Sequence, residues 1–246
     1  MIAEIAYTRH GTASAKPPLL LSHGFGASQA MWRTNLEALG AQRELLTWDL
    51  PGHGASGAGG ELSQERCIAE MLALLDLLGA PRAIICGMSL GGYLSLLLCA
   101  RHPERVAALV LVDTGPGFRD HAARAAWNTW VAGLADDLDA RGLSALRAGP
   151  ESAGAEHRAG ASGLAAAARA ILSQRDGEVL ASLERITAPT LIVVGAQDEQ
   201  FLPAAHVMAR RIPGAREVTL ENAGHAANIE QAAAFNGAVG EFLEEL

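Results

Sequence analysis

Short apolar runs alternate along this chain with longer segments in which apolar residues recur at helical spacing. The apolar runs end at polar or glycine-containing turns and predict buried strands at 18–22, 44–49, 83–86, 106–112, 190–194 and 218–220. The amphipathic segments predict helices at 31–39, 63–78, 91–101 and 229–246. Strands that alternate with helices form a parallel sheet covered on both faces, so the pattern predicts an α/β fold.

Residues 115–185 interrupt this alternation. The segment is rich in alanine and arginine, has no convincing strand pattern and includes two of the four tryptophans, Trp127 and Trp130. We expect it to be a helical cap inserted over a functional site. The remaining α/β core then consists of residues 1–114 and 186–246.

Composition and charge narrow the classes of function. Half of the residues are hydrophobic, which allows a large core, and the formal net charge is −8. An acidic surface repels phosphate backbones and anionic lipids, so we expect neither a nucleic-acid partner nor a membrane partner. No apolar run is long enough to span a bilayer, the first residues lack a leader pattern, and the three cysteines fit no metal motif. These features predict a cytoplasmic protein with reduced cysteines.

The segment Gly87-Met88-Ser89-Leu90-Gly91 lies between a predicted strand and a predicted helix. In this context the Gly-x-Ser-x-Gly pattern is typical of a nucleophile elbow, a sharp strained turn that exposes the serine hydroxyl. The two glycines give the space that such a turn needs. The N–H of Leu90, at the start of the helix, would face the negative charge that forms when a carbonyl is attacked. The pattern predicts Ser89 as a nucleophile.

Five motifs, in order along the chain, resemble the α/β-hydrolase superfamily. They are His23-Gly24-Phe25-Gly26, Asp49-Leu50-Pro51-Gly52-His53-Gly54-Ala55-Ser56, the Ser89 elbow, Gly195-Ala196-Gln197-Asp198 and Gly224-His225. The resemblance covers nearly the whole chain except the expected cap, and it implies a mostly parallel sheet flanked by helices. Fold and catalytic machinery can be carried over, but the substrate cannot, because this fold hosts many reactions.

The resemblance also implies a Ser-His-Asp catalytic triad. His225 occupies the position of the family's catalytic base, in a turn at the same sheet edge as Ser89. Asp198 gives the chain order Ser, Asp, His that this fold uses. Asp113, which ends another predicted strand, is the alternative acid, because some family members take the acid from that position.

An oxyanion hole completes the expected machinery. Its donors would be the backbone N–H groups of Phe25 and Leu90, close to the carbonyl oxygen of the substrate. No zinc spacing, phosphate loop or dinucleotide fingerprint occurs in the chain, so we expect no metal and no organic cofactor. A serine nucleophile also argues against the carbon–halogen and epoxide chemistry of relatives that attack with aspartate.

The substrate expected from this pattern is a small-molecule ester or lactone. The elbow and the segment His225-Ala226-Ala227-Asn228-Ile229-Glu230 resemble small cofactor-free serine esterases and 3-oxoadipate enol-lactonases. The cap residues Trp127, Trp130 and Leu134 are candidates for substrate binding, and packing within the cap is the alternative explanation. An enol-lactone would also need a cation for its carboxylate, for which the candidates are Arg119, Arg124 and Arg169.

Two other classes of function stay open. The same triad could serve a carbon–carbon bond hydrolase or a proton-abstraction lyase, in which arginine and asparagine side chains would converge beside Ser89. A small-lactone receptor with a slow triad is the second alternative. We expect a monomer or a homodimer.

Overall fold

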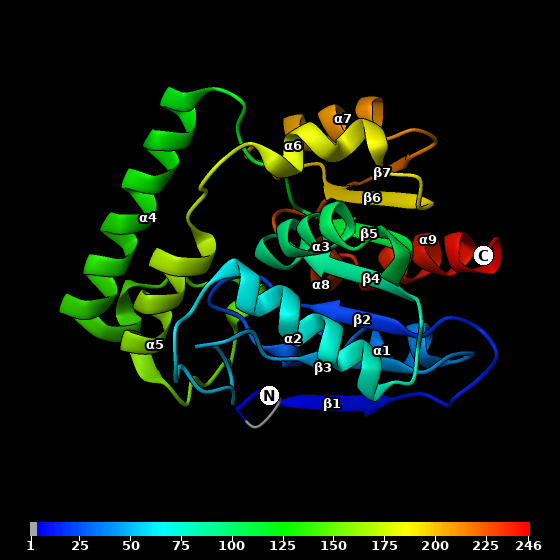
Figure 1. Cartoon of the computed structure of the whole chain (residues 1–246), viewed down its shortest axis with the longest axis horizontal. Coiled ribbons are helices and arrows are strands. Elements are labelled where there is room, and N and C mark those ends of the chain that lie inside the picture. The colour runs from blue at the N-terminus through cyan, green and yellow to red at the C-terminus, as the bar shows by residue number, and fades with distance from the viewer. Residues whose placement is uncertain (1–3) are drawn as a thin grey trace.

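The computed structural model describes residues 4–246 and contains a seven-stranded sheet with helices on both faces (Figure 1). The strands are β1 (Tyr7–His10), β2 (Leu19–Ser22), β3 (Leu45–Trp48), β4 (Ala83–Met88), β5 (Val106–Val112), β6 (Thr190–Gly195) and β7 (Arg216–Leu220). Their order in the sheet is β1-β3-β2-β4-β5-β6-β7, and only β1 runs antiparallel to its neighbour. The expected α/β fold with a mostly parallel sheet is confirmed.

Side chains alternate along the buried strands between two apolar layers. In β2, Leu20 belongs to the layer formed with one group of helices, whereas Leu19 and Leu21 belong to the opposite layer. The first layer includes α2 (Gln64–Leu77), α3 (Leu90–Arg101), α6 (Glu178–Ser182) and α7 (Leu202–Arg211). The second includes α1 (Leu36–Gly40), α8 (Ala227–Glu230) and α9 (Ala232–Glu244). Because β2 to β7 run parallel, the loops that leave their carboxyl ends meet at one edge of the sheet, which the two helix layers leave open.

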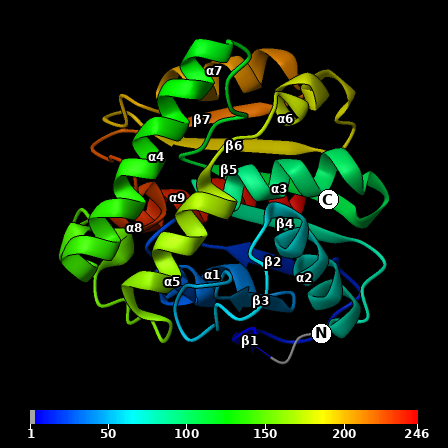
Figure 2. The same cartoon turned by 60° about the vertical axis from the view of Figure 1, so that its left-hand side comes forward.

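Two helices, α4 (His121–Arg141) and α5 (Gly160–Ala167), stand beside each other beyond this edge (Figures 1 and 2). Helix α5 contacts the core at backbone distance, since a Cβ on Gly52 would lie 2.7 Å from the Gly163 carbonyl oxygen. His157 adds a polar contact, because its Nδ1 accepts from the N–H of Gly54 at 3.0 Å. The later helix α6 packs on α3. The expected cap was residues 115–185; because α6 packs on α3, we propose a shorter cap of residues 115–177, with α6 in the core.

Several boundaries differ from the expected ones. A 3-10 turn (Gln29–Trp32) and α1 replace the single helix expected at 31–39, and α8 and α9 divide the helix expected at 229–246. The sequence pattern also missed β1 and α7. The helix expected at 63–78 is present as α2, and the Ser63 hydroxyl accepts from the N–H of Arg66 as an N-cap. Among residues 4–246, no helix combines the length and apolar character needed to cross a bilayer.

Candidate active site

Ser89 lies at the turn between β4 and α3 with φ 51° and ψ −114°, a conformation that few residues other than glycine adopt. Its N–H donates to the Val112 carbonyl at 2.9 Å, and its carbonyl accepts from the Thr114 hydroxyl at 2.6 Å. A Cβ on Gly87 would lie 2.3 Å from the Gly91 backbone, so this turn closes only with glycine there. The strained turn holds the Ser89 hydroxyl at the edge of the sheet, as the elbow pattern predicts.

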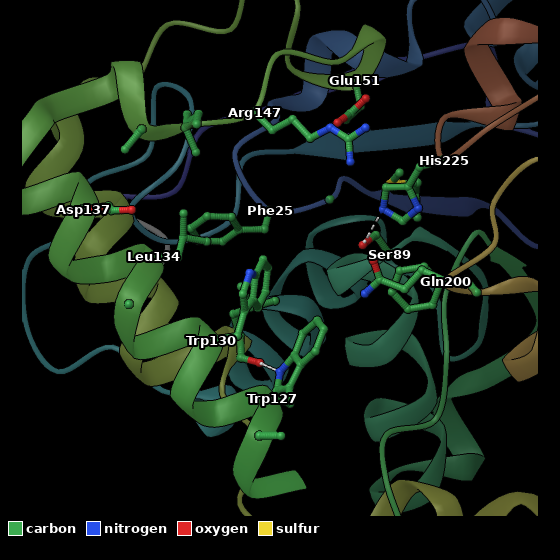
Figure 3. Close-up of a pocket in the computed structure, with 18 of the residues that line it drawn as sticks. Phe25, Ser89, Trp127, Trp130, Leu134, Asp137, Arg147, Glu151, Gln200 and His225 are labelled. Atoms are coloured by element: carbon green, nitrogen blue, oxygen red, sulfur yellow. Dashed lines mark hydrogen bonds between the residues drawn. The ribbon is translucent and has the colours of Figure 1, made fainter. Parts of the chain in front are cut away.

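His225 follows β7 and faces the serine. Its Nε2 lies 3.1 Å from Ser89 Oγ (Figure 3), and its Nδ1 lies 2.7 Å from Asp198 Oδ2. The Glu230 carboxylate accepts from the backbone N–H groups on both sides of His225, each at 3.0 Å, and so fixes the loop. The Phe201 ring stacks on the imidazole, with ring centroids 5.0 Å apart. The imidazole is therefore held in one orientation between a hydroxyl and a carboxylate.

The two candidate acids have different partners. Asp198 follows β6, is almost fully buried and contacts His225 directly. Asp113 follows β5 with φ 44°, and its two carboxylate oxygens accept from the backbone N–H groups of Gly195 (2.8 Å) and Ala227 (2.9 Å). Asp113 thereby links the ends of β5 and β6 to α8. The geometry favours Asp198 as the partner of the histidine.

The pKa values of these groups follow from burial and charge. Burial lowers the pKa of His225, but the hydrogen bond and the charge of Asp198 outweigh burial and place this pKa above its ordinary value. Burial raises the pKa of the Asp113 carboxyl to about 7, although its backbone hydrogen bonds favour the ionised form. The imidazolium form of His225 is thus stabilised by the carboxylate beside it.

The loop that carries Phe25 approaches Ser89 from the end of β2. A Cβ on Gly24 would lie 2.7 Å from the Met88 sulfur, so glycine permits this approach. The Phe25 ring packs edge-on against His53, with centroids 5.1 Å apart. The N–H of Leu90 opens helix α3 and, like all N–H groups in a first helical turn, has no partner within the helix. The two expected oxyanion donors, the N–H groups of Phe25 and Leu90, therefore lie on backbone segments next to Ser89.

A cavity of about 1290 Å³ lies between the cap and Ser89. Trp127, Trp130 and Leu134 line it from α4, and Leu134 lies beside Phe25 (Figure 3). A second pocket of about 170 Å³ also reaches Ser89 and shares Phe118, Trp127, Leu172, Gln200 and Phe201 with the first. The serine thus lies where a large cavity and a small one meet.

The three arginines proposed as carboxylate ligands lie elsewhere, since Arg119, Arg124 and Arg169 do not line the cavity. Arg169 instead pairs with Asp136 and Asp139. Arg147, which the sequence pattern missed, does line the cavity and points into it (Figure 3). No signal in the sequence marked it, because its position depends on the path of the loop between the cap helices.

Comparison with known proteins relates this chain to the alpha/beta hydrolases. A model described as the alpha/beta hydrolase family matches residues 19–238. A pimeloyl-acyl-carrier-protein methyl ester esterase of Aromatoleum aromaticum is 32% identical over 234 residues, which cover 86% of this chain and 92% of that protein.

Two solved structures resemble this protein over nearly its whole chain. The enol-lactonase from Burkholderia xenovorans LB400 superposes with a TM-score of 0.78 at 26% identity, covering 98% of this chain and 96% of the other. A hydrolase from Pseudomonas aeruginosa PA01 superposes with a TM-score of 0.80 at 33% identity, covering 97% of this chain and 94% of the other.

Proposed function

The chain belongs to the α/β-hydrolase family, and we propose that it is a serine hydrolase that cleaves a carboxylic ester or lactone through an acyl-enzyme. The observation that carries this proposal is the hydrogen-bonded series Ser89–His225–Asp198 at the junction of the two pockets. A serine hydroxyl is a weak nucleophile at neutral pH and needs a base to activate it. His225 is placed to be that base, because its Nε2 lies 3.1 Å from Ser89 Oγ and Asp198 fixes its other nitrogen.

Each residue has one role in the proposed reaction. Ser89 Oγ attacks the carbonyl carbon while His225 Nε2 takes its proton, and Asp198 stabilises the resulting imidazolium. The N–H groups of Phe25 and Leu90 donate to the oxyanion. His225 then protonates the leaving alcohol oxygen, and the acyl group remains on Ser89. A water molecule, deprotonated by His225, attacks the acyl-enzyme and releases the acid.

Esters and lactones are the substrates named for two of the proteins that this chain resembles. The relatives include a methyl ester esterase at 32% identity and an enol-lactonase at 26% identity. The carbon–carbon hydrolase alternative required arginine and asparagine side chains beside the serine. The described residues that line the two pockets include Arg147 but no asparagine, which favours the simpler ester or lactone reaction.

We expect short acyl chains to react best with this enzyme. The small pocket is largely apolar, with Leu90, Tyr93 and Pro116 on its walls, and we assign it to the acyl group. Assays of p-nitrophenyl esters from acetate to decanoate should show kcat/KM highest at or below about six carbons, since longer chains cannot enter without displacing side chains. Turnover that rises steadily to decanoate would contradict this assignment, and no turnover of any ester or aliphatic lactone would contradict the proposed function.

The proposed base predicts a loss of activity at acid pH. His225 must be neutral to accept the serine proton, and its pKa is raised, so the loss should begin at a higher pH than for an unperturbed histidine. Below this pKa, kcat/KM should fall about tenfold per pH unit. The measurement is kcat/KM for p-nitrophenyl butyrate between pH 4 and 9, with fluorescence to verify that the protein stays folded.

Asp113→Asn is the control for this profile, because the Asp113 carboxyl also titrates near pH 7. The acid limb should persist in that variant if it reports His225. A rate that stays constant down to pH 4 in the native protein would rule out His225 as the base.

A further inference from the structure

One cationic side chain enters the large cavity. Among the described residues that line it, Arg147 is the only arginine or lysine, and it extends from the loop between α4 and α5 toward His225 (Figure 3). Most other walls are apolar, with Phe25, Trp127 and Trp130 prominent. Three acidic side chains, those of Asp136, Asp137 and Glu151, also line the cavity.

The acidic residues of the same cavity are mostly paired with other cations. Asp136 binds Arg169 at 2.6 Å, and Asp137 binds Arg141 at 2.8 Å. Arg147 has no carboxylate within 4.0 Å in residues 4–246, although Glu151 lies on the same side of the cavity (Figure 3). The Arg147 guanidinium is therefore available to a group that enters from solvent.

We propose that Arg147 binds a carboxylate carried by the substrate, so that the enzyme acts on esters or lactones that bear a free carboxylate. This inference rests on the proposed hydrolase function. The planar guanidinium offers two parallel N–H donors to a carboxylate, and such charge-assisted pairs are stronger than neutral hydrogen bonds. The carboxylate would lie on the His225 side of the cavity, and the apolar part of the substrate would lie against the tryptophans.

Glu151 lowers the preference of the cavity for substrates that carry a carboxylate. Its negative charge contributes to the raised pKa of His225, and it lies on the same side of the cavity as Arg147. A fixed negative charge near a bound carboxylate weakens its binding by repulsion. Removal of the Glu151 charge should therefore increase the preference for anionic substrates, whereas removal of the Arg147 charge should decrease it.

The test compares esters of similar size that differ in charge. Mono-p-nitrophenyl glutarate is paired with p-nitrophenyl pentanoate, and the butyryl ester of 4-hydroxybenzoate is paired with that of 4-hydroxybenzamide. The first pair places the carboxylate on the acyl half and the second on the alcohol half. The measured quantity is the ratio of kcat/KM for the anionic ester to that for the neutral ester.

In at least one pair, Arg147→Gln should lower this ratio about tenfold, Arg147→Lys should lower it less, and Glu151→Gln should raise it. Arg33→Gln is the matched control, because Arg33 is exposed outside the cavity and its loss changes the net charge equally. The native ratio should also fall as salt increases, since ions screen the pair.

Each outcome separates this inference from the proposed function. If neutral esters are hydrolysed but Arg147→Gln changes neither ratio, or if Arg33→Gln changes them as much, the carboxylate site is wrong and the hydrolase function stands. If the native protein hydrolyses neither esters nor lactones, the hydrolase function is wrong. Calorimetric titration with glutarate then tests the carboxylate site by itself. Glutarate must bind to the native protein and bind about tenfold more weakly to Arg147→Gln; any other result contradicts the site.

Discussion

Replacing Ser89 with alanine should lower kcat/KM for p-nitrophenyl esters by at least about 10³-fold. The hydroxyl is the only group of Ser89 that would bond to the substrate, and alanine removes it without adding bulk to the strained turn. The residual rate would come from the oxyanion donors and from binding alone. Steady-state kinetics across the ester series measures the effect, and the same loss should appear with aliphatic lactones.

The fold should survive this change. Alanine keeps the Ser89 N–H that donates to Val112 and the carbonyl that accepts from Thr114, so the thermal midpoint should move little. Ser162→Ala is the matched control, because that hydroxyl is exposed on α5 and bonds only locally to Ala159. A Ser89→Ala protein that retains full activity would exclude an acyl-enzyme on this serine.

The arrangement of the candidate catalytic residues was predictable because each of them follows a strand. Ser89, Asp198 and His225 follow β4, β6 and β7, and parallel strands bring such loops to one edge whatever the details of the helices. The elbow glycines also carry a direct steric signal, since the contact of Gly87 with the Gly91 backbone leaves no room for a Cβ. These features depend on local sequence and on the handedness of βαβ units, which are nearly invariant.

Other features depend on tertiary contacts that no periodicity encodes. The helix expected at 31–39 is interrupted at Asn35, whose buried amide donates to the Asn228 carbonyl and to Asn236, far away in the sequence. Strand β1 escaped prediction because it is an exposed edge strand with polar residues, paired only with β3. Arg147 and Phe201 reach the candidate site through loop conformations and through cap docking, so the sequence pattern did not mark their positions.

Replacing Asp198 with asparagine should lower kcat by about 10³–10⁴-fold while the protein stays folded. The carboxylate accepts the Nδ1 proton of His225 and so keeps Nε2 free to accept from Ser89. An amide can donate to Nδ1 instead, which favours the wrong tautomer, and it no longer stabilises the imidazolium. The pKa of His225 should fall as well, because the charge that raises it is lost. Kinetics and the pH profile of the variant measure both effects.

Asp113→Asn distinguishes the two acids, because it changes the same functional group at the neighbouring strand end. At pH 8 the ionised Asp113 accepts two backbone N–H bonds, from Gly195 and Ala227, and an amide can accept only one of them. We therefore expect the free energy of unfolding to fall by about 1–3 kcal/mol and kcat to change less than about tenfold. The raised pKa of Asp113 also means that stability falls as pH rises from about 4 to about 7, and the variant should lose this slope. If Asp113→Asn instead removes activity as fully as Asp198→Asn, with stability unchanged, Asp113 is the acid of the triad and the assignment to Asp198 is wrong.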